Sequence, residues 1–263
     1  MNGERDEDLE RFRGASSRQN GEVGRSVFTG VAHLCQTAVR MTGVDGAATA
    51  LLTERSRVRD LVYATNPIAQ WIDEMQFTLG DGPCLAAFQE RAPQLVPDLT
   101  DPRYGARWPA FVGEALGAGV AAIFAFPISD DQSALGVLEL YRATPGPLSV
   151  SEYEAAASCA AEAGATVRKN WSDYISRANE LQSPADALAL ELSDPSNDEG
   201  FSRSRVFMAS GMLAVQWGIL PEEAMDRLRA YAFGSGRSIN DVADDVIGRQ
   251  LTHVDLSGGD DRA

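Results

Sequence analysis

Arginine side chains supply the positive charge in the last stretch of the chain that has the pattern of folded structure, residues 203–249. This stretch contains six arginines and six acidic residues, so it is neutral although the whole chain carries a net charge of −15. Arginine pairs with phosphate groups and stacks on unpaired bases, the two contacts on which RNA recognition depends. An acidic chain is a poor nucleic-acid binder as a whole. The neutral local balance of residues 203–249 reduces that objection for this part of the chain.

Cys84 is the second residue that could do chemistry, because it follows a Gly-Asp-Gly-Pro turn and is expected near the start of a helix. At that position the helix dipole lowers the pKa of a thiol and favours thiolate chemistry. The alternative is a small buried side chain, since cysteine is among the most buried residue types. Cys35 and Cys159 lie far from Cys84 in the sequence, and no CxxC pair is present, so neither a disulfide framework nor a zinc site is indicated. A reducing cytoplasm fits this cysteine usage.

Large aromatic side chains in the first half of the chain, together with Cys84, are candidates for the lining of an effector cavity. Aromatic residues also dominate any core of this size, so a purely structural role is the alternative. No cofactor and no metal are expected, and with only His33 and His253 a haem held by an axial histidine is not indicated. The candidate pocket residues are Trp71, Phe77, Cys84, Trp108, Phe111 and Phe124.

The elements that carry the pocket candidates alternate between strand and helix patterns. A helix over Arg25–Gly43 comes first, and five strand-like runs and three more helices follow. Strands that are neighbours in sequence, with helices inserted between them, favour an antiparallel α+β sheet over a parallel one. The expected strands are Gly46–Leu52, Arg57–Ala64, Pro93–Pro97, Val120–Pro127 and Ala134–Tyr141, and the expected helices are Asn66–Met75, Pro83–Arg91 and Trp108–Leu116.

Four short segments of this first region resemble a GAF domain of the kind placed ahead of RNA-binding modules in actinobacterial regulators. They are FTLGDGPCLA at 77–86, LVPDL at 95–99, RWPAF at 107–111 and GVLELY at 136–141. The resemblance implies a sensor domain at about 25–150, with a small antiparallel sheet and a pocket on one face for a small-molecule effector. The motifs of cyclic-nucleotide and bilin-binding members are missing, so the effector stays unidentified.

A long helix is predicted from Ser151 to Gln182, with apolar and alanine residues near alternating three and four spacing. This spacing is that of a coiled-coil seam, and Asn170 within it would fix the register, so a parallel homodimer through 151–192 is expected. The alternative is that the helix packs on its own sheet. A polar hinge is expected at 193–201, and disordered tails are expected at 1–24 and 252–263.

No run of residues approaches the roughly 18 apolar residues that a membrane span needs. The first residues also lack the apolar core of a signal peptide. We therefore expect a cytoplasmic protein that does not contact a membrane.

The last group of elements is predicted to be three short amphipathic helices. The first has apolar residues at helical spacing on one face and Gly218 to end it. The second starts at Pro221, a favourable first helical residue, and the third follows Ser238, a capping residue. Three such helices predict a small all-α bundle at 202–251.

The sequence of these three helices resembles the ANTAR domain, an RNA-binding output module of bacterial transcription antiterminators. The family's Ala-x-Gly, Glu-Ala, Leu-Arg and Asp-Val-Ala patterns recur at fixed offsets, at Ala209 and Gly211, Glu223 and Ala224, Leu228 and Arg229, and Asp241, Val242 and Ala243. Ser210 departs from the family, in which many members have a basic or amide residue. The resemblance implies binding to paired short hairpins with matching loops in nascent transcripts, which disfavours a downstream terminator.

Together the two resemblances imply a signal-responsive RNA-binding regulator of transcription and not an enzyme. The alternatives are a GAF-type redox enzyme using Cys84, as in free methionine sulfoxide reductases, and a protein-interaction adaptor whose bundle no longer binds RNA. The expected RNA contacts are Arg205, Ser210, Arg229, Tyr231 and Arg237.

Overall fold

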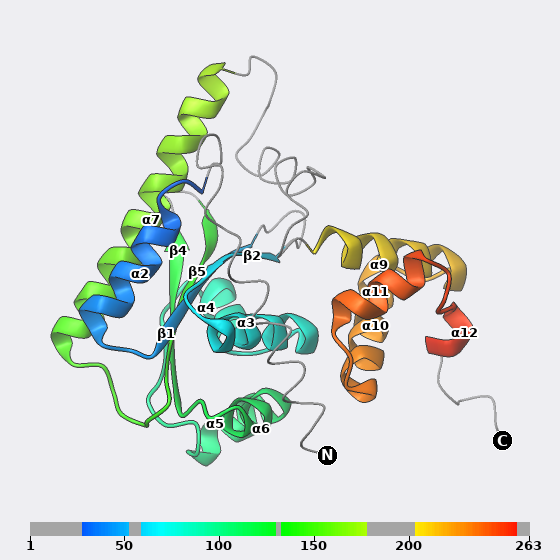
Figure 1. The fold of residues 1–263 in the computed structure, drawn as a ribbon, viewed down its shortest axis with the longest axis horizontal. Helices are drawn as coiled ribbons and strands as arrows, with labels where there is room; N and C mark the ends of the chain where they lie inside the picture. The colour runs from blue at the N-terminus through cyan, green and yellow to red at the C-terminus, as the bar shows by residue number, and fades with distance from the viewer. Residues whose placement is uncertain (1–27, 53–58, 130–132, 178–202, 257–263) are drawn as a thin grey trace.

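The computed structural model describes residues 28–52, 59–129, 133–177 and 203–256 (Figure 1). The predicted tail at 1–24, the predicted hinge at 193–201 and the end of the predicted linker lie outside these ranges. Two bodies of structure are present, a domain built on a sheet within residues 28–177 and a helical bundle within residues 203–256.

The sheet domain is built on five antiparallel strands in the order β2-β1-β5-β4-β3, which confirms the predicted α+β class with an antiparallel sheet. All five predicted strands are found, with ends that differ by up to two residues in the ranges described. The strands are β1 (Gly46–Leu52), β2 (Arg59–Ala64), β3 (Gln94–Val96), β4 (Ala122–Ser129) and β5 (Ala134–Arg142).

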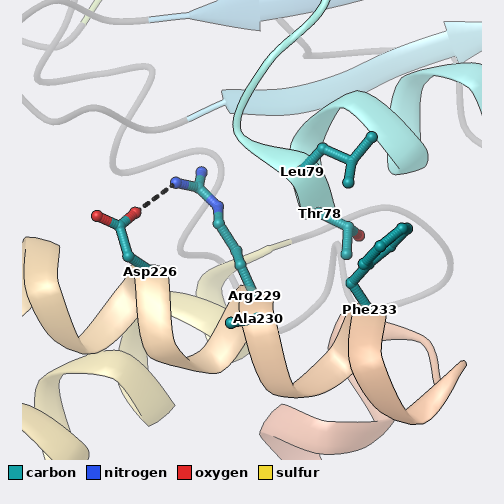
Figure 2. Close-up of a pocket in the computed structure, with 6 residues that line it drawn as sticks. All are labelled: Thr78, Leu79, Asp226, Arg229, Ala230 and Phe233. Atoms are coloured by element: carbon teal, nitrogen blue, oxygen red, sulfur yellow. Dashed lines mark hydrogen bonds and ion pairs between the residues drawn. The ribbon is translucent and has the colours of Figure 1, made fainter. Parts of the chain in front are cut away.

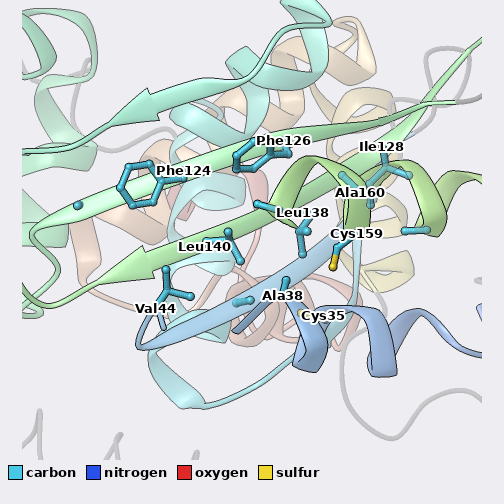
Figure 3. Close-up of a cluster of buried hydrophobic side chains, with 14 residues drawn as sticks. Cys35, Ala38, Val44, Phe124, Phe126, Ile128, Leu138, Leu140, Cys159 and Ala160 are labelled. Carbon is cyan, nitrogen blue, oxygen red and sulfur yellow. The ribbon is translucent and has the colours of Figure 1, made fainter. Parts of the chain in front are cut away.

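Helices cover both faces of this sheet. On one face α2 (Val31–Thr42) and α7 (Val150–Arg177) enclose a cluster of apolar residues with β4 and β5 (Figure 3). α7 lies very close to β4 at Gly164. A Cβ added at this glycine would be 2.4 Å from the carbonyl oxygen of Ser129. The helices on the other face are α3 (Pro67–Leu79), α4 (Pro83–Glu90), α5 (Pro102–Arg107), which the sequence did not predict, and α6 (Pro109–Gly117).

α7 contains the residues that were predicted to form a coiled-coil seam between two copies of the chain. Ala156, Ala160 and Ala163 instead pack against the sheet of their own domain. Val167 is 8% exposed and lies in a cluster with Val31 and Trp171.

Asn170 is likewise engaged within the chain, because its side-chain nitrogen donates to the carbonyl oxygen of Thr29 at 2.9 Å. The described part of the helix thus packs on its own sheet, which was the alternative interpretation. A small-residue stripe serves helix–sheet packing as well as helix–helix packing. Homodimerisation stays a prediction.

The helical bundle consists of α9 (Ser204–Trp217), α10 (Pro221–Ser235) and α11 (Ile239–Ile247), followed by the short α12 (His253–Leu256). The three predicted helices are confirmed, and Gly218 and Gly236 end two of them with left-handed φ angles of 68° and 65°. The prediction of a disordered tail at 252–263 is wrong for its first residues, because α12 forms there and Leu256, which is 8% exposed, packs into the bundle core.

Candidate functional site

α3 of the sheet domain contacts the bundle through an ion pair that is almost completely buried. The guanidinium of Arg203, the residue before α9, lies with Nη2 2.5 Å from Oδ2 of Asp73, and the two side chains are 3% and 1% exposed. The pair is separated by 130 residues in the sequence. Removing one partner of such a pair leaves an uncompensated buried charge, so the contact requires both residues.

Phe77 lies one helical turn after Asp73 on the same face of α3 and packs among the apolar residues of the bundle. Its ring makes an edge contact with Phe207 of α9 at 6.2 Å between centroids, and the guanidinium carbon of Arg203 lies 3.9 Å from the ring centroid. Phe77 is 2% exposed. A predicted pocket residue of the sheet domain therefore belongs to the core of the bundle.

Arg229 of α10 contacts the end of α3. Its Nε donates to the carbonyl oxygen of Phe77 at 3.0 Å, and its Nη1 lies 3.4 Å from Oδ1 of Asp226. The helix C-terminus carries partial negative charge, which favours a guanidinium at this position. The side chain of Arg229 is 24% exposed, so an RNA contact expected from the sequence is largely occupied by α3.

A groove of about 250 Å³ separates the end of α3 from α10 (Figure 2). Phe233 stands on its α10 side, where it is 43% exposed, and the carboxylate of Asp226 faces the Arg229 guanidinium. The groove therefore combines an aromatic ring with a guanidinium at the boundary between the two bodies. Its lining residues are Thr78, Leu79, Asp226, Arg229, Ala230 and Phe233.

Charges from both bodies act on the Glu74 carboxyl of α3. Burial raises the pKa of the Glu74 carboxyl on α3, and the nearby Arg203 guanidinium opposes that rise. The charges of Asp73 and of Asp241 on α11 raise the same pKa further. Arg203 is therefore a cation that offsets part of the electrostatic cost of burying the acidic groups of α3.

The other predicted RNA contacts lie elsewhere on the bundle. Arg205 and Arg237 both pair with acidic residues of α11, the first with Asp244 and the second with Asp245 at 2.6 Å. The hydrogen bond to Asp245 raises the pKa of Arg237. Arg205 and Arg237 thus share α11 as their partner, whereas Arg229 reaches to α3.

Ser210 is placed where RNA cannot reach it without opening the bundle. It is 2% exposed, and its hydroxyl donates to the carbonyl oxygen of Pro221 at 2.8 Å. Its role is to fasten α9 to the start of α10, which corrects the prediction that it contacts RNA. Tyr231 is half-buried and packs against the bundle core.

A buried polar cluster on the α3 side of the sheet was missed from the sequence. The Gln76 amide nitrogen donates to both carboxylate oxygens of Glu139 on β5, at 2.9 and 2.8 Å, and its oxygen accepts from the backbone N–H of Cys84 at 2.8 Å. Gln76 is fully buried, and Glu139 and Cys84 are 4% and 1% exposed.

Gly82 lets this cluster form, because a Cβ at that position would lie 2.5 Å from the Gln76 side-chain oxygen and its φ is +136°. The cluster thereby ties α3 to the central strand β5 and to the first turn of α4. A polar residue within an alternating strand pattern normally faces solvent, so no local pattern indicates that Glu139 is buried.

The six candidate pocket residues do not line one cavity. Trp71, Trp108 and Phe111 share one apolar cluster, which is the part of the prediction that the structure brings together. Phe124 packs on the opposite face of the sheet, beside α2 and α7 (Figure 3). Phe77 belongs to the bundle core, and Cys84 lies in a small separate cluster with Ala50, Ala87, Val137 and neighbouring residues.

Two negative findings apply to the described ranges. Within 28–52, 59–129, 133–177 and 203–256, no group of three or more His, Cys, Asp or Glu side chains is arranged to hold a metal ion. Among the helices in these ranges, none combines the length and the apolar character that a membrane crossing needs.

Solved structures with similar backbones include several GAF domains. The GAF domain of an Acinetobacter phosphoenolpyruvate-protein phosphotransferase is 16% identical, with a TM-score of 0.43, over 64% of this chain and 95% of its own. The GAF-B domain of DevS from Mycobacterium smegmatis is 17% identical, with a TM-score of 0.41, over 56% of this chain and 95% of its own.

A type II free methionine-R-sulfoxide reductase from Thermoplasma acidophilum is 15% identical, with a TM-score of 0.37, over 54% of this chain and 93% of its own. No curated protein sequence matches the chain. Residues 30–167, more than half of the chain, match the GAF domain family, and this match includes the first two thirds of α7, beyond the boundary expected at 150. The chain therefore belongs to the GAF domain family.

Proposed function

We propose that this chain is a signal-responsive RNA-binding regulator in which the GAF domain controls the helical bundle. The GAF domain supports a sensory role, with a small molecule or a redox signal as the input. The bundle is the output, acting on paired stem-loops in nascent transcripts by transcription antitermination. The helical bundle would thereby couple the signal to the fate of a transcript.

The observation that carries the proposal is how the ANTAR-like residues divide between the interior and the surface of the bundle. The apolar members of the pattern, including Ala209, Leu228 and Val242, are fully buried in its core. The polar members Glu223 and Asp241 are exposed. A pattern that places its apolar residues inside and its charged residues outside is consistent with a bundle whose surface meets a charged partner.

The arginines at the bundle surface are suited to meet phosphate. Arg205 and Arg237 have side chains that are 46% and 37% exposed, and they pair with carboxylates at the surface. Exposed ion pairs contribute about 0 to 1 kcal/mol, so an RNA phosphate can take the place of the carboxylate at little cost. Arg229 and Tyr231 would add a base contact, because a guanidinium and a phenol ring both stack on unpaired bases.

The redox-enzyme alternative has less support from the geometry. The Cys84 thiol is 1% exposed, and Cys35 and Cys159 pack together in the cluster on the opposite face of the sheet. A catalytic thiol needs access to its substrate and a partner that resolves the oxidised form. Cys84→Ser is therefore expected to leave RNA affinity unchanged.

RNA binding is tested by ultraviolet crosslinking of the full chain to cellular RNA, followed by affinity measurements. The probes are a synthetic RNA with two short hairpins of matching loops and the same RNA with one hairpin deleted. Arg229→Ala should weaken binding of the paired-hairpin RNA by about 1 to 3 kcal/mol if a base is read. The matched control is Arg227→Ala, which removes the same charge from an exposed residue on the same helix, paired with Glu223.

The RNA-binding proposal fails if no RNA is crosslinked and neither probe binds. Crosslinking of a protein in place of RNA would favour the interaction-adaptor alternative. Equal losses for Arg229→Ala and Arg227→Ala would show that charge alone is involved and would remove Arg229 from the site.

A further inference from the structure

We propose that α3 of the GAF domain is an intramolecular clasp that holds the bundle in a state with reduced access to RNA. The clasp consists of Asp73 and Phe77 on α3 with Arg203, Phe207 and Arg229 on the bundle. This inference rests on the proposed function, and it assigns the regulation of the RNA site to a specific contact.

α3 is buried on two neighbouring faces at once. Ile72 and Gln76 lie one turn apart and face the sheet, in the apolar cluster of the GAF domain and in the bonds to Glu139. The next residue after each of these, Asp73 and Phe77, faces the bundle. A displacement of α3 relative to the sheet is therefore transmitted directly to the bundle.

The ion pair of the clasp is suited to reversible separation. The Arg203–Asp73 pair is buried, so its attraction is set against the loss of hydration of both ions. Separation of the two bodies returns both ions to water together, which leaves no unpaired buried charge. The ion pair itself therefore adds little net stability to the clasped state, and the contact that a signal must overcome is chiefly the packing of Phe77 in the bundle core.

In the clasp, RNA and α3 compete for the side chain of Arg229. The Nε of Arg229 donates to the Phe77 carbonyl oxygen. The guanidinium also lies against Gly80, which has a φ of +68°, and a Cβ at that position would be only 3.0 Å from Nη1 of Arg229. A donor bonded to α3 is not available to a base or a phosphate. The groove of Figure 2 lies beside this contact and would widen as the clasp opens.

The polar cluster provides the connection to the sensor. Gln76 precedes Phe77 and is bonded to Glu139 on β5 and to the N–H of Cys84 at the start of α4. A change in the spacing of β5 and α4 therefore acts on the residue next to the clasp. Hydrogen bonds in a buried site are costly to leave unmade, so the cluster moves as a unit with α3.

The clasp is tested with release variants of the full chain and the paired-hairpin RNA as the probe. Asp73→Ala removes the buried partner of Arg203 and should tighten RNA binding by about tenfold, since affinity scales with the fraction of the binding-competent state. Glu154→Ala is the matched control, because it removes one acidic charge from an exposed residue of α7 and should leave affinity unchanged. In the released background, Arg229→Ala should weaken binding, which separates the RNA role of Arg229 from its clasp role.

A locked form provides the opposite perturbation and does not depend on the stability of a release variant. Thr78→Cys and Ala230→Cys place thiols on the two sides of the groove, and a short bismaleimide joins them while the three native cysteines are buried. The crosslinked chain should bind the RNA about tenfold more weakly than the Ala230→Cys chain treated with a quenched reagent.

The possible results separate the two proposals. Tighter binding on release and weaker binding on locking support the clasp. Measurable and equal affinities in the released, locked and unmodified chains overturn the clasp and leave RNA binding intact. An absence of RNA binding in all forms, including the released one, overturns the proposed function and the clasp with it.

Discussion

The buried polar cluster allows a quantitative prediction for Gln76→Leu. Leucine occupies a similar volume, so the principal loss is of hydrogen bonds at a fully buried position. The bonds to the buried Glu139 carboxyl and from the buried Cys84 N–H contribute about 1 to 2 kcal/mol each, because a buried polar group left without its partner is costly. The expected decrease in the free energy of unfolding is about 2 to 4 kcal/mol.

Urea unfolding of the full chain, followed by fluorescence of the GAF-domain tryptophans, measures this decrease. Gln70→Leu is the matched control on the same helix, because Gln70 is half-buried and its contact with Glu74 is long, at 3.5 Å. It should change stability by about 0.5 kcal/mol or less.

A double-mutant cycle with Glu139→Leu isolates the pair. The double variant should cost less than the sum of the two single variants, because removal of both partners leaves no buried carboxylate without a donor from Gln76. A stability loss below about 0.5 kcal/mol for Gln76→Leu, or strict additivity in the cycle, would show that the Gln76–Glu139 bond does not stabilise the fold.

Three other predictions concern stability. Ser210→Ala should cost about 1 kcal/mol in unfolding experiments through loss of the bond to Pro221, with the RNA affinity of the folded protein unchanged. Val167→Asp should lower the melting temperature by several degrees through burial of a charge within the chain, whatever oligomeric state light scattering gives for the unmutated protein. Burial raises the pKa of the Cys35 thiol from 9.0 to about 12, so the folded state keeps a proton that the unfolded state loses above pH 9. The contribution of this proton to the free energy of unfolding is fully present below pH 9 and is lost as pH rises towards 12, with a decrease of about 2 kcal/mol at pH 10.5. In urea unfolding, Cys35→Ala should lack this part of the pH dependence.

Hydrophobic periodicity was sufficient to locate nearly all of the elements. A strand of period 2 and a helix of period 3.6 leave distinct patterns, and glycines such as Gly43 and Gly218 mark helix ends by their left-handed φ of 61° and 68°. The short helices α5 and α12 have too few turns for a periodic pattern. Their existence depends on local caps, such as Asp101 before α5, and on packing.

Periodicity was not sufficient to identify what each face contacts. The alanine stripe of α7 correctly indicated a buried face, but the same pattern fits a partner helix and a sheet. Phe77 was a candidate for the lining of a GAF pocket, and the structure shows it among the apolar residues of the bundle. The site residues missed from sequence belong to pairs far apart in the chain, 63 residues for Gln76 with Glu139 and 130 for Asp73 with Arg203, for which no local pattern exists.

Amide hydrogen exchange of the full chain, with and without the paired-hairpin RNA, tests most directly whether α3 and RNA compete for the bundle. Protection from exchange reports local opening, so a helix end that loses its packing partner exchanges faster. If α3 and RNA compete, RNA should slow exchange in α10 around Arg229 and accelerate it in the last turn of α3, around Phe77 and Gly80. Slower exchange in both segments, or RNA binding that leaves the last turn of α3 unchanged, would contradict this competition.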